Sequence, residues 1–262
     1  MIIAKKSLGQ NFLNDKNIIE KISGITNIEN KEILEVGPGT GNLTNSLLKK
    51  NPKKIYAIEK DTQLALELKK KFKDNVSIIN KDILDFDESS LSDEKLIVFG
   101  NLPYNISTEI LCKWILNLKN EKMWFSKLIL MFQKEVADRI VSDYNCSNYG
   151  RLTILANWKL NVKKIINIKP TSFFPKPKVD SSLLFFSPKK EFFEIKNPYN
   201  LEKITRIFFN HRRKMIKKPF NQLFNGNQKI LDELNINLNL RPQNLDFDTY
   251  YKLTEAYEKL GS

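Results

Sequence analysis

Apolar residues in the first 190 positions follow two patterns, short continuous runs and stripes with a period near 3.6 residues. The runs predict strands covered on both faces, and the stripes between them predict amphipathic helices. Strands are expected at 32–36, 54–59, 76–80, 95–100 and 127–132, and helices at 42–50, 62–73, 106–118 and 135–142. This alternation is typical of a parallel α/β sheet with right-handed crossovers.

The end of the chain shows a different pattern. Two further apolar runs, 162–168 and 179–186, follow a predicted helix at 152–159 and have no helix between them, so we expect them to pair antiparallel. After residue 188 only helical stripes remain, at 201–213, 228–234 and 249–260. The sequence therefore predicts an α/β domain over residues 1–190 and a small helical domain over residues 191–262.

Composition points to a polyanionic partner. The 262 residues carry a formal charge of +13, which favours such a partner, although a generally Lys-rich proteome would give the same excess. Cys112, Cys146 and His211 have no metal-ligand spacing, so we expect no metal and no disulfide. The chain shows neither a signal h-region at residues 1–4 nor a run of ~20 apolar residues, which predicts a cytoplasmic protein without a membrane span.

A glycine-rich turn follows the first predicted strand. Gly37, Gly39 and Gly41 let the chain turn tightly and approach a ligand closely. The dinucleotide fingerprint needs its third glycine at the position of Asn42, so this turn disfavours a pyrophosphate site. A tight turn without a ligand remains the alternative. Residues 5–13 are interpreted as a loop, either a lid over this turn or an ordinary N-terminal arm, with Asn14 as the N-cap of the next helix.

Polar residues close three of the predicted strands, where open α/β sheets bind their ligands. Glu59 is placed to accept both hydroxyls of a ribose, and Asp82 to accept a hydrogen bond from an adenine amine. Asn101-Leu102-Pro103-Tyr104 follows the fourth strand and is the most specific motif in the chain. The alternatives are a solvated residue at the start of a loop for Glu59, an ordinary strand-end aspartate for Asp82, and a turn with a core tyrosine for the motif, which is the less favoured reading there.

The Asn101-Leu102-Pro103-Tyr104 motif suits transfer of a group to a base amine. Such an amine is a poor nucleophile because its lone pair is delocalised into the ring. The side-chain carbonyl of Asn101 and the backbone carbonyl of Leu102, directed by Pro103, can accept hydrogen bonds from the two N–H groups of the amine. These hydrogen bonds free its lone pair. Tyr104 can stack on a base taken out of its helix.

Two segments supply aromatic and basic groups for a nucleic acid. Residues 172–179 form a proline-restricted loop in which Phe173 or Phe174 can cover a base, beside Lys176 and Lys178. Residues 211–218 follow an apolar helix and include Arg212, Arg213 and Lys214, with Arg151 a further candidate phosphate contact. Core packing for the phenylalanines and helix capping for the cations are the alternatives.

Four segments together resemble the ribosomal RNA adenine N6-dimethyltransferase family, over residues 8–253. They are residues 9–13, 35–41, 101–108 and 173–181. The resemblance implies a Rossmann-like class I methyltransferase sheet and S-adenosyl-L-methionine as donor. It implies donor contacts at Asn11, Leu13, Gly37, Glu59, Asp82 and Asn101, and target-base contacts at Asn101, Leu102, Tyr104 and Phe173. Lys176 departs from the family pattern, in which proline or other residues are usual.

Residues 149–152, 209–214 and 240–242 resemble the family's small-subunit branch, which dimethylates two adjacent adenosines near the 3′ end of that RNA. The resemblance implies small-subunit ribosomal RNA in an immature particle as partner, and we expect a monomer. Three alternatives stay open: a large-subunit RNA dimethyltransferase that gives macrolide resistance, a mainly non-catalytic ribosome assembly factor, and, least favoured, a nicotinamide dehydrogenase.

Overall fold

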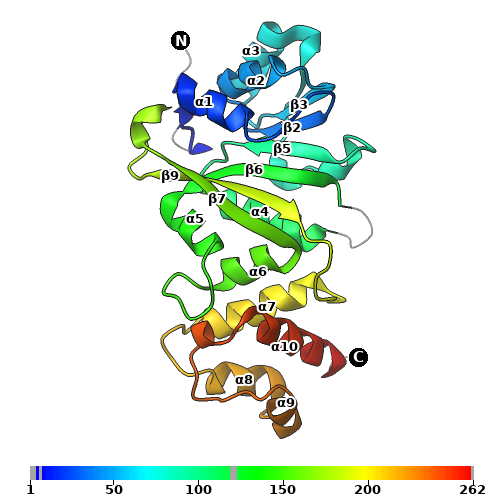
Figure 1. The fold of residues 1–262 in the computed structure, drawn as a ribbon, viewed down its shortest axis with the longest axis vertical. Helices are drawn as coiled ribbons and strands as arrows, with labels where there is room; N and C mark the ends of the chain where they lie inside the picture. Colours follow the sequence, from blue (N-terminus) through cyan, green and yellow to red (C-terminus); the bar gives the residue numbers. More distant parts are fainter. Residues whose placement is uncertain (1–3, 6–7, 119–122, 261–262) are drawn as a thin grey trace. The chain divides into compact units, whose positions relative to one another are not determined.

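The computed structural model describes residues 4–5, 8–118 and 123–260 (Figure 1). Residues 1–3, which belong to the segment searched for a signal h-region, lie outside the described residues. So do residues 6–7 of the predicted N-terminal loop. The chain forms two compact units. The first comprises Met1–Lys113, Leu118–Ala137 and Val162–Pro188; the second comprises Trp114–Asn117, Asp138–Asn161 and Lys189–Ser262. The functional division predicted at residue 190 stays a prediction.

A seven-stranded sheet is the centre of the first unit, with strand order β4-β3-β2-β5-β6-β9-β7. The strands are β2 (Glu32–Val36), β3 (Lys54–Ile58), β4 (Ser77–Ile79), β5 (Leu96–Gly100), β6 (Phe125–Gln133), β7 (Leu160–Ile168) and β9 (Ser181–Pro188). From β4 to β6 all pairs are parallel, and β9 pairs antiparallel with β6. The predicted α/β class with a mostly parallel sheet is therefore confirmed.

Helices connect these strands along the chain. They are α1 (Lys16–Ser23), α2 (Asn42–Leu48), α3 (Thr62–Phe72), α4 (Ser107–Asn117), α5 (Lys134–Ile140) and α6 (Arg151–Lys159). Ile33, Ile97 and Ile129 of the sheet belong to one core cluster with Leu47 of α2 and Leu68 of α3. Alternate strand residues point to opposite faces, and their neighbours in sequence are also buried, so the sheet is covered on both faces.

The first helix begins one residue later than the sequence predicted. Asp15, not Asn14, is the N-cap, and its side chain accepts hydrogen bonds from the N–H groups of Asn17 and Ile18. The side-chain oxygen of Asn14 is occupied instead by Asn42 Nδ2, at 2.9 Å. Of the two adjacent side chains, Asp15 thus caps α1 and Asn14 contacts a residue 28 positions away.

A second, two-stranded ladder was not predicted. β1 (Phe12–Leu13) pairs antiparallel with β8 (Phe173–Phe174), so that Phe12 lies opposite Phe174 and Leu13 opposite Phe173. Both segments were expected to be loops, because two residues are too few to show a period. The pairing fixes the N-terminal arm to a loop far along the chain.

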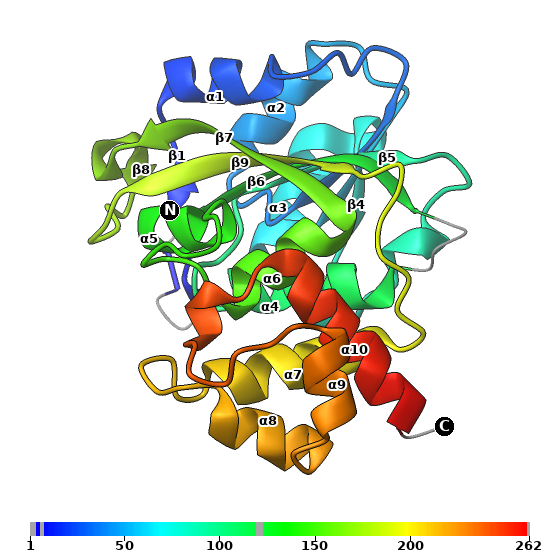
Figure 2. The ribbon, with the colours of Figure 1, turned by 60° about the horizontal axis from the view of Figure 1, so that its bottom comes forward.

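The second unit is helical in its C-terminal part, with α7 (Pro198–Phe209), α8 (Lys217–Phe224), α9 (Gln228–Glu233) and α10 (Phe247–Leu260) (Figure 2). α6, α7 and α10 pack against one another, and α7 also contacts α8. Two predictions were wrong here: α7 ends before the basic run, and α8 was missed. α8 carries Pro219 in its first turn, where proline is tolerated.

No helix in the described part of the chain is long and apolar enough to cross a membrane. The residues of that part also contain no group of three or more His, Cys, Asp or Glu side chains arranged to hold a metal ion.

The glycine turn gives a prediction about stability. Gly37 (φ 69°) and Gly41 (φ 76°) are both left-handed, but a Cβ at Gly41 would lie 2.6 Å from Phe72, whereas one at Gly37 meets nothing closer than 3.5 Å. Gly37→Ala should therefore lower the free energy of unfolding by ~1–2 kcal/mol, the cost of the left-handed backbone. Gly41→Ala should lower it by a further ~1–3 kcal/mol of overpacking.

Urea unfolding of both variants, followed by circular dichroism without ligand, measures the difference. Equal losses for the two variants would show that the packing of Phe72 against the turn contributes nothing.

Candidate functional site

The carboxyl ends of four parallel strands meet at one edge of the sheet. β2 pairs with β3 on one side and β5 on the other, so Val36 lies beside both Ile58 and Gly100. The chain leaves the sheet there at Gly37, Glu59 and Asn101, and Asp82 follows three residues after the end of β4. Strand order reverses around β2, which is where open α/β sheets hold their ligands. A cavity opens at this edge.

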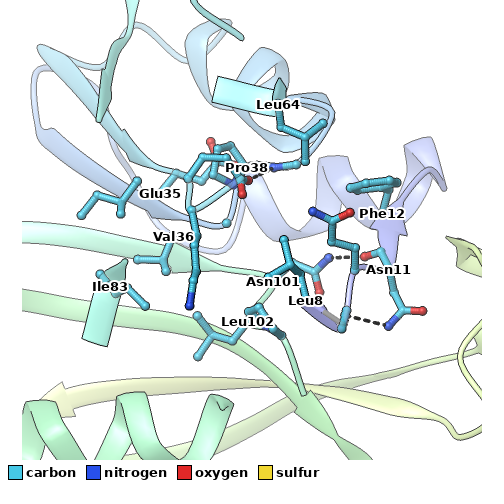
Figure 3. A pocket seen from close by; sticks show the side chains of 18 of the residues that line it. Leu8, Asn11, Phe12, Glu35, Val36, Pro38, Leu64, Ile83, Asn101 and Leu102 are labelled. Atoms are coloured by element: carbon cyan, nitrogen blue, oxygen red, sulfur yellow. Dashed lines mark hydrogen bonds between the residues drawn. The ribbon is translucent and has the colours of Figure 1, made fainter. Parts of the chain in front are cut away.

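The residues that line this cavity come from the strand ends and from the N-terminal arm (Figure 3). Every predicted donor contact is among them: Asn11, Leu13, Gly37, Glu59, Asp82 and Asn101. The Asn101-Leu102-Pro103-Tyr104 motif lines it too. Phe173 does not line it. The roles assigned to these residues stay predictions.

The glycine turn forms one wall, and the N-terminal arm packs directly against it. A Cβ at Gly39, where φ is 56°, would lie 2.8 Å from the ring of Phe12. This close approach requires glycine at position 39. The turn therefore allows the N-terminal arm to pack beside the cavity.

Glu59 is held at the cavity by backbone N–H groups. Its Oε2 accepts from Gly39 N at 3.1 Å, and its Oε1 accepts from Asp61 N at 2.9 Å. Burial raises the pKa of this carboxyl, and the backbone hydrogen bonds oppose that rise. A carboxylate has about four acceptor positions, so both oxygens keep capacity for a further donor.

Asp82 lies in a more polar environment. Its Oδ2 pairs with Lys60 Nζ at 2.5 Å and its Oδ1 accepts from Leu84 N at 3.1 Å. Burial acts to raise the pKa of Asp82, but these hydrogen bonds outweigh it, and the pKa lies below its usual value. The side chain is therefore ionised and can act only as an acceptor.

Lys113 of α4 supports the same wall, and sequence reasoning missed it. Its Nζ donates to Ile83 O at 2.6 Å, to Phe86 O, and to Glu88 Oε1 at 2.9 Å. These bonds hold the segment after Asp82, which supplies Ile83 and Leu84 to the cavity. A lysine on a predicted helix carries no signal of such a role, because its partners lie 25–30 positions away.

Asp61 fastens the N-terminal arm, and it too escaped notice in the sequence. Lys5 Nζ reaches its Oδ1 at 2.9 Å, and Gln10 Nε2 reaches its Oδ2 at 3.1 Å. The same carboxylate accepts from Gln63 N and caps α3. The arm is therefore anchored on one side by Asp61 and on the other by the β1–β8 ladder.

The orientation of the Asn101 amide follows from its partner. Asn101 Nδ2 donates to Asn11 O at 2.8 Å (Figure 3). A carbonyl oxygen can only accept, so the nitrogen must face Asn11 and the side-chain oxygen Oδ1 is left to accept from another group. The acceptor that the motif requires is thereby set by the N-terminal arm.

Tyr104 is half-buried at the cavity, and its hydroxyl hydrogen-bonds to Ser181 Oγ. Burial raises the pKa of the phenol, so it stays neutral. The two phenylalanines of the 172–179 loop differ sharply: Phe173 is 2% exposed and belongs to the core, whereas Phe174 is 64% exposed.

The predicted RNA-binding cations also fall into two groups. Arg212 donates to the backbone carbonyls of Cys146 and Ser147, and Arg151 pairs with Glu202 at 2.8 Å. Arg213, Lys214, Lys176 and Lys178 lie at the surface. Arg151 and Arg212 thus have structural partners, while their predicted phosphate contacts stay predictions.

Glu35 is a buried carboxyl with an incomplete set of partners. The residue is 2% exposed at the end of β2, and its Oε2 has no hydrogen-bond partner among the described residues. Burial raises its pKa to about 7, and the nearby Glu59 also acts in that direction. The fold therefore favours the protonated form.

Known proteins resemble the whole chain. Residues 2–259 match the family model described as "Ribosomal RNA adenine dimethylase". "Ribosomal RNA small subunit methyltransferase A" of Pelagibacter ubique (strain HTCC1062) is 64% identical over 257 residues, 98% of each chain. The crystal structure of a dimethyladenosine transferase from Plasmodium falciparum, 30% identical, has a TM-score of 0.80 over 95% of this chain and 98% of that one.

The crystal structure of the 23S rRNA methyltransferase ErmE is 22% identical, with a TM-score of 0.68 over 95% of this chain and 100% of that one. At that identity the likeness concerns the fold alone. It agrees with the predicted methyltransferase sheet.

Glu35 gives a prediction about the pH dependence of stability. The folded chain keeps its proton up to about pH 7, whereas the unfolded chain releases it near 4.5. The protonated Glu35 side chain therefore makes its full contribution to the free energy of unfolding below pH 4.5. That contribution is lost as the pH rises to 7. Over this window Glu35 should cost the protein up to ~3 kcal/mol, and Glu35→Gln should remove that loss.

Urea titrations of both proteins at several pH values between about 4.5 and 8 measure the effect. Parallel curves for wild type and Glu35→Gln would show that Glu35 titrates normally in the folded chain.

Proposed function

This chain belongs to the ribosomal RNA adenine dimethylase family, and from that membership we propose its reaction. It dimethylates the N6 amines of two adjacent adenosines near the 3′ end of small-subunit ribosomal RNA, with S-adenosyl-L-methionine as donor. The observation that carries the proposal is the free acceptor Oδ1 of Asn101, fixed by Asn11 beside a cavity at the sheet's switch point. It acts as a monomer on an immature ribosomal particle in the cytoplasm.

The cavity fits the donor in chemistry. The Glu59 carboxylate has acceptor capacity left for the two ribose hydroxyls, and Gly37 and Gly39 line the cavity without a side chain, so a donor can approach their backbone closely. The ionised Asp82 accepts from the adenine amine, while Asn11, Leu13 and Gly37 surround the rest. When bound, the donor supplies a methyl group on a sulfonium centre.

The chain's own part in the chemistry is to hold the target amine. Asn101 Oδ1 and the carbonyl of Leu102 accept hydrogen bonds from its two N–H groups, which restores nucleophilic character to the nitrogen. Pro103 restricts the backbone that directs the Leu102 carbonyl. Tyr104, held by Ser181, stacks on the extruded base. Alignment supplies most of the rate, and no strong general base is required.

The substrate assignment gives a direct test. Small subunits that lack the modification, incubated with the enzyme and S-adenosyl-L-methionine, should gain two neighbouring N6,N6-dimethyladenosines. Mass spectrometry of nuclease fragments locates them, with large subunits as the matched control. One modified adenosine in large-subunit RNA would overturn the branch assignment, and no transfer to either would overturn the reaction.

Free and structurally engaged cations should affect RNA binding differently. Arg213 and Lys214 lie at the surface, so replacing both with Gln should lower the slope of log affinity against log salt by ~0.7–0.9 for each phosphate that is no longer bound. The unfolding temperature should stay unchanged. Arg212→Gln is the matched control, because it removes the bonds to Cys146 and Ser147 and should lower that temperature.

Filter binding to small-subunit RNA at several salt concentrations gives the slope. If the slope of the Arg213→Gln, Lys214→Gln protein equals that of the wild type, these two cations do not contact phosphate.

A further inference from the structure

Lys60 joins the segments that follow two neighbouring strands at the cavity. It comes after β3, and Asp82 comes after β4; these strands pair in parallel, with Ile58 beside Ile79. Lys60 Nζ donates to Asp82 Oδ2 at 2.5 Å, and both residues line the cavity. One side chain therefore ties the loop that carries Glu59 to the loop that carries Asp82.

The backbone at Lys60 is also held in place. Asn80 Nδ2 donates to Glu59 O at 2.8 Å and to Lys60 O at 3.2 Å, so the residue after β4 fastens the turn after β3. Within that turn, Glu59 Oε1 accepts from Asp61 N at 2.9 Å. Glu59, the predicted ribose acceptor, and Lys60 therefore belong to one hydrogen-bonded turn.

The ion pair with Lys60 fixes the orientation of the Asp82 carboxylate. Asp82 Oδ1 accepts from Leu84 N at 3.1 Å. A carboxylate that is held at one oxygen alone can still rotate about its Cβ–Cγ bond, and the second bond, from Lys60 to Oδ2, opposes that rotation. A carboxylate has about four acceptor positions, so both oxygens keep capacity for a further donor in this orientation.

Both partners of the pair are charged. The hydrogen bond and charge of Asp82, together with the charge of Asp85, raise the pKa of Lys60. Burial acts to raise the pKa of Asp82, but its hydrogen bonds and the charges of Lys60 and Lys113 lower it overall. Because the Lys60 side chain is 55% exposed, the pair stabilises the fold little, and its main effect is on the orientation of Asp82.

This end of the cavity lies away from the N-terminal arm. Ile83, next to Asp82, is on the opposite side of the cavity from Asn11 and Phe12 (Figure 3). Ile83 and Leu84 add apolar lining beside the carboxylate. An apolar wall with one fixed acceptor suits a flat heteroaromatic base that carries an amine.

We propose that Lys60 is a positioning residue for the donor: it holds Asp82 in the orientation that accepts from the adenine amine. Lys60 thereby sets the preference of the cavity for adenine over a base with a carbonyl at the same position. This role rests on the proposed function and concerns the same cavity. The ionised Asp82 can only accept, so it attracts an amine and repels a carbonyl oxygen. A carboxylate that is free to rotate loses both effects, because it can turn away from either group.

Titration calorimetry with S-adenosylhomocysteine and S-inosylhomocysteine tests this role, since the second carries a carbonyl where adenine has its amine. Lys60→Met removes the ammonium and keeps an unbranched side chain. It should raise the Kd of S-adenosylhomocysteine about 2- to 5-fold, the range for a largely exposed ion pair, and lower the preference over S-inosylhomocysteine. Lys60→Arg, which can still pair with Asp82, should keep both values. An unchanged preference in Lys60→Met would overturn the proposal.

A double-mutant cycle separates positioning from direct contact with the donor. In a protein that already carries Asp82→Ala, Lys60→Met should change neither the Kd nor the preference, because no carboxylate remains to be held. If Lys60→Met has the same effect with and without Asp82, Lys60 contacts the donor itself and the positioning role is wrong.

Lys81→Met is the matched control for charge. Lys81 lines the same cavity and precedes Asp82, but within the described residues it forms no ion pair. Lys81→Met removes the same positive charge and should keep the wild-type preference for adenine. A loss of preference as large as that in Lys60→Met would assign the effect to net charge instead of the ion pair, and would overturn the proposal.

Methyl transfer to ribosomal subunits separates this role from the proposed function. A wild-type protein whose preference for adenine depends on Lys60, but which modifies neither subunit, would count against the proposed function alone. A protein that methylates small subunits while Lys60→Met keeps the wild-type preference would count against the role of Lys60 alone.

Discussion

The parallel pairing of β2 with both β3 and β5 is the constraint on which the site depends. It brings the residues after three strands to one edge, in a register that places Val36 beside Ile58 and Gly100. Because connections on the two sides of β2 run in opposite directions along the sheet, the loops diverge and leave space between them. The glycine turn, Glu59 and Asn101 meet there although they lie far apart in the sequence.

Local signals predicted this part of the molecule well. The apolar runs before Gly37, Glu59 and Asn101 set strand ends, and a parallel sheet then fixes where those ends meet. Boundaries differed by only a few residues in most elements of the sheet. The sequence sufficed because each of these features depends on a continuous segment and on one general rule of topology.

Contacts across long separations were the ones that sequence reasoning missed. The β1–β8 ladder, the Lys113 bonds behind Asp82 and the Asp61 anchor of the arm each join segments 25 or more positions apart. These contacts do not change the periodicity of the segments that make them, so the sequence pattern does not predict them. Arg212 is the converse case: its type and position suggested a phosphate contact, and only the fold shows that it holds two backbone carbonyls.

The β1–β8 ladder, which the sequence did not predict, joins the N-terminal arm to a loop far along the chain. Asn11 directs the Asn101 amide through its backbone carbonyl, and the next residues, Phe12 and Leu13, are the strand that pairs with Phe173 and Phe174. The arm is thus held by this strand pair in the position that orients the acceptor. The orientation of the Asn101 acceptor therefore depends on one short piece of sheet, which Leu13 and Phe173 anchor in the core.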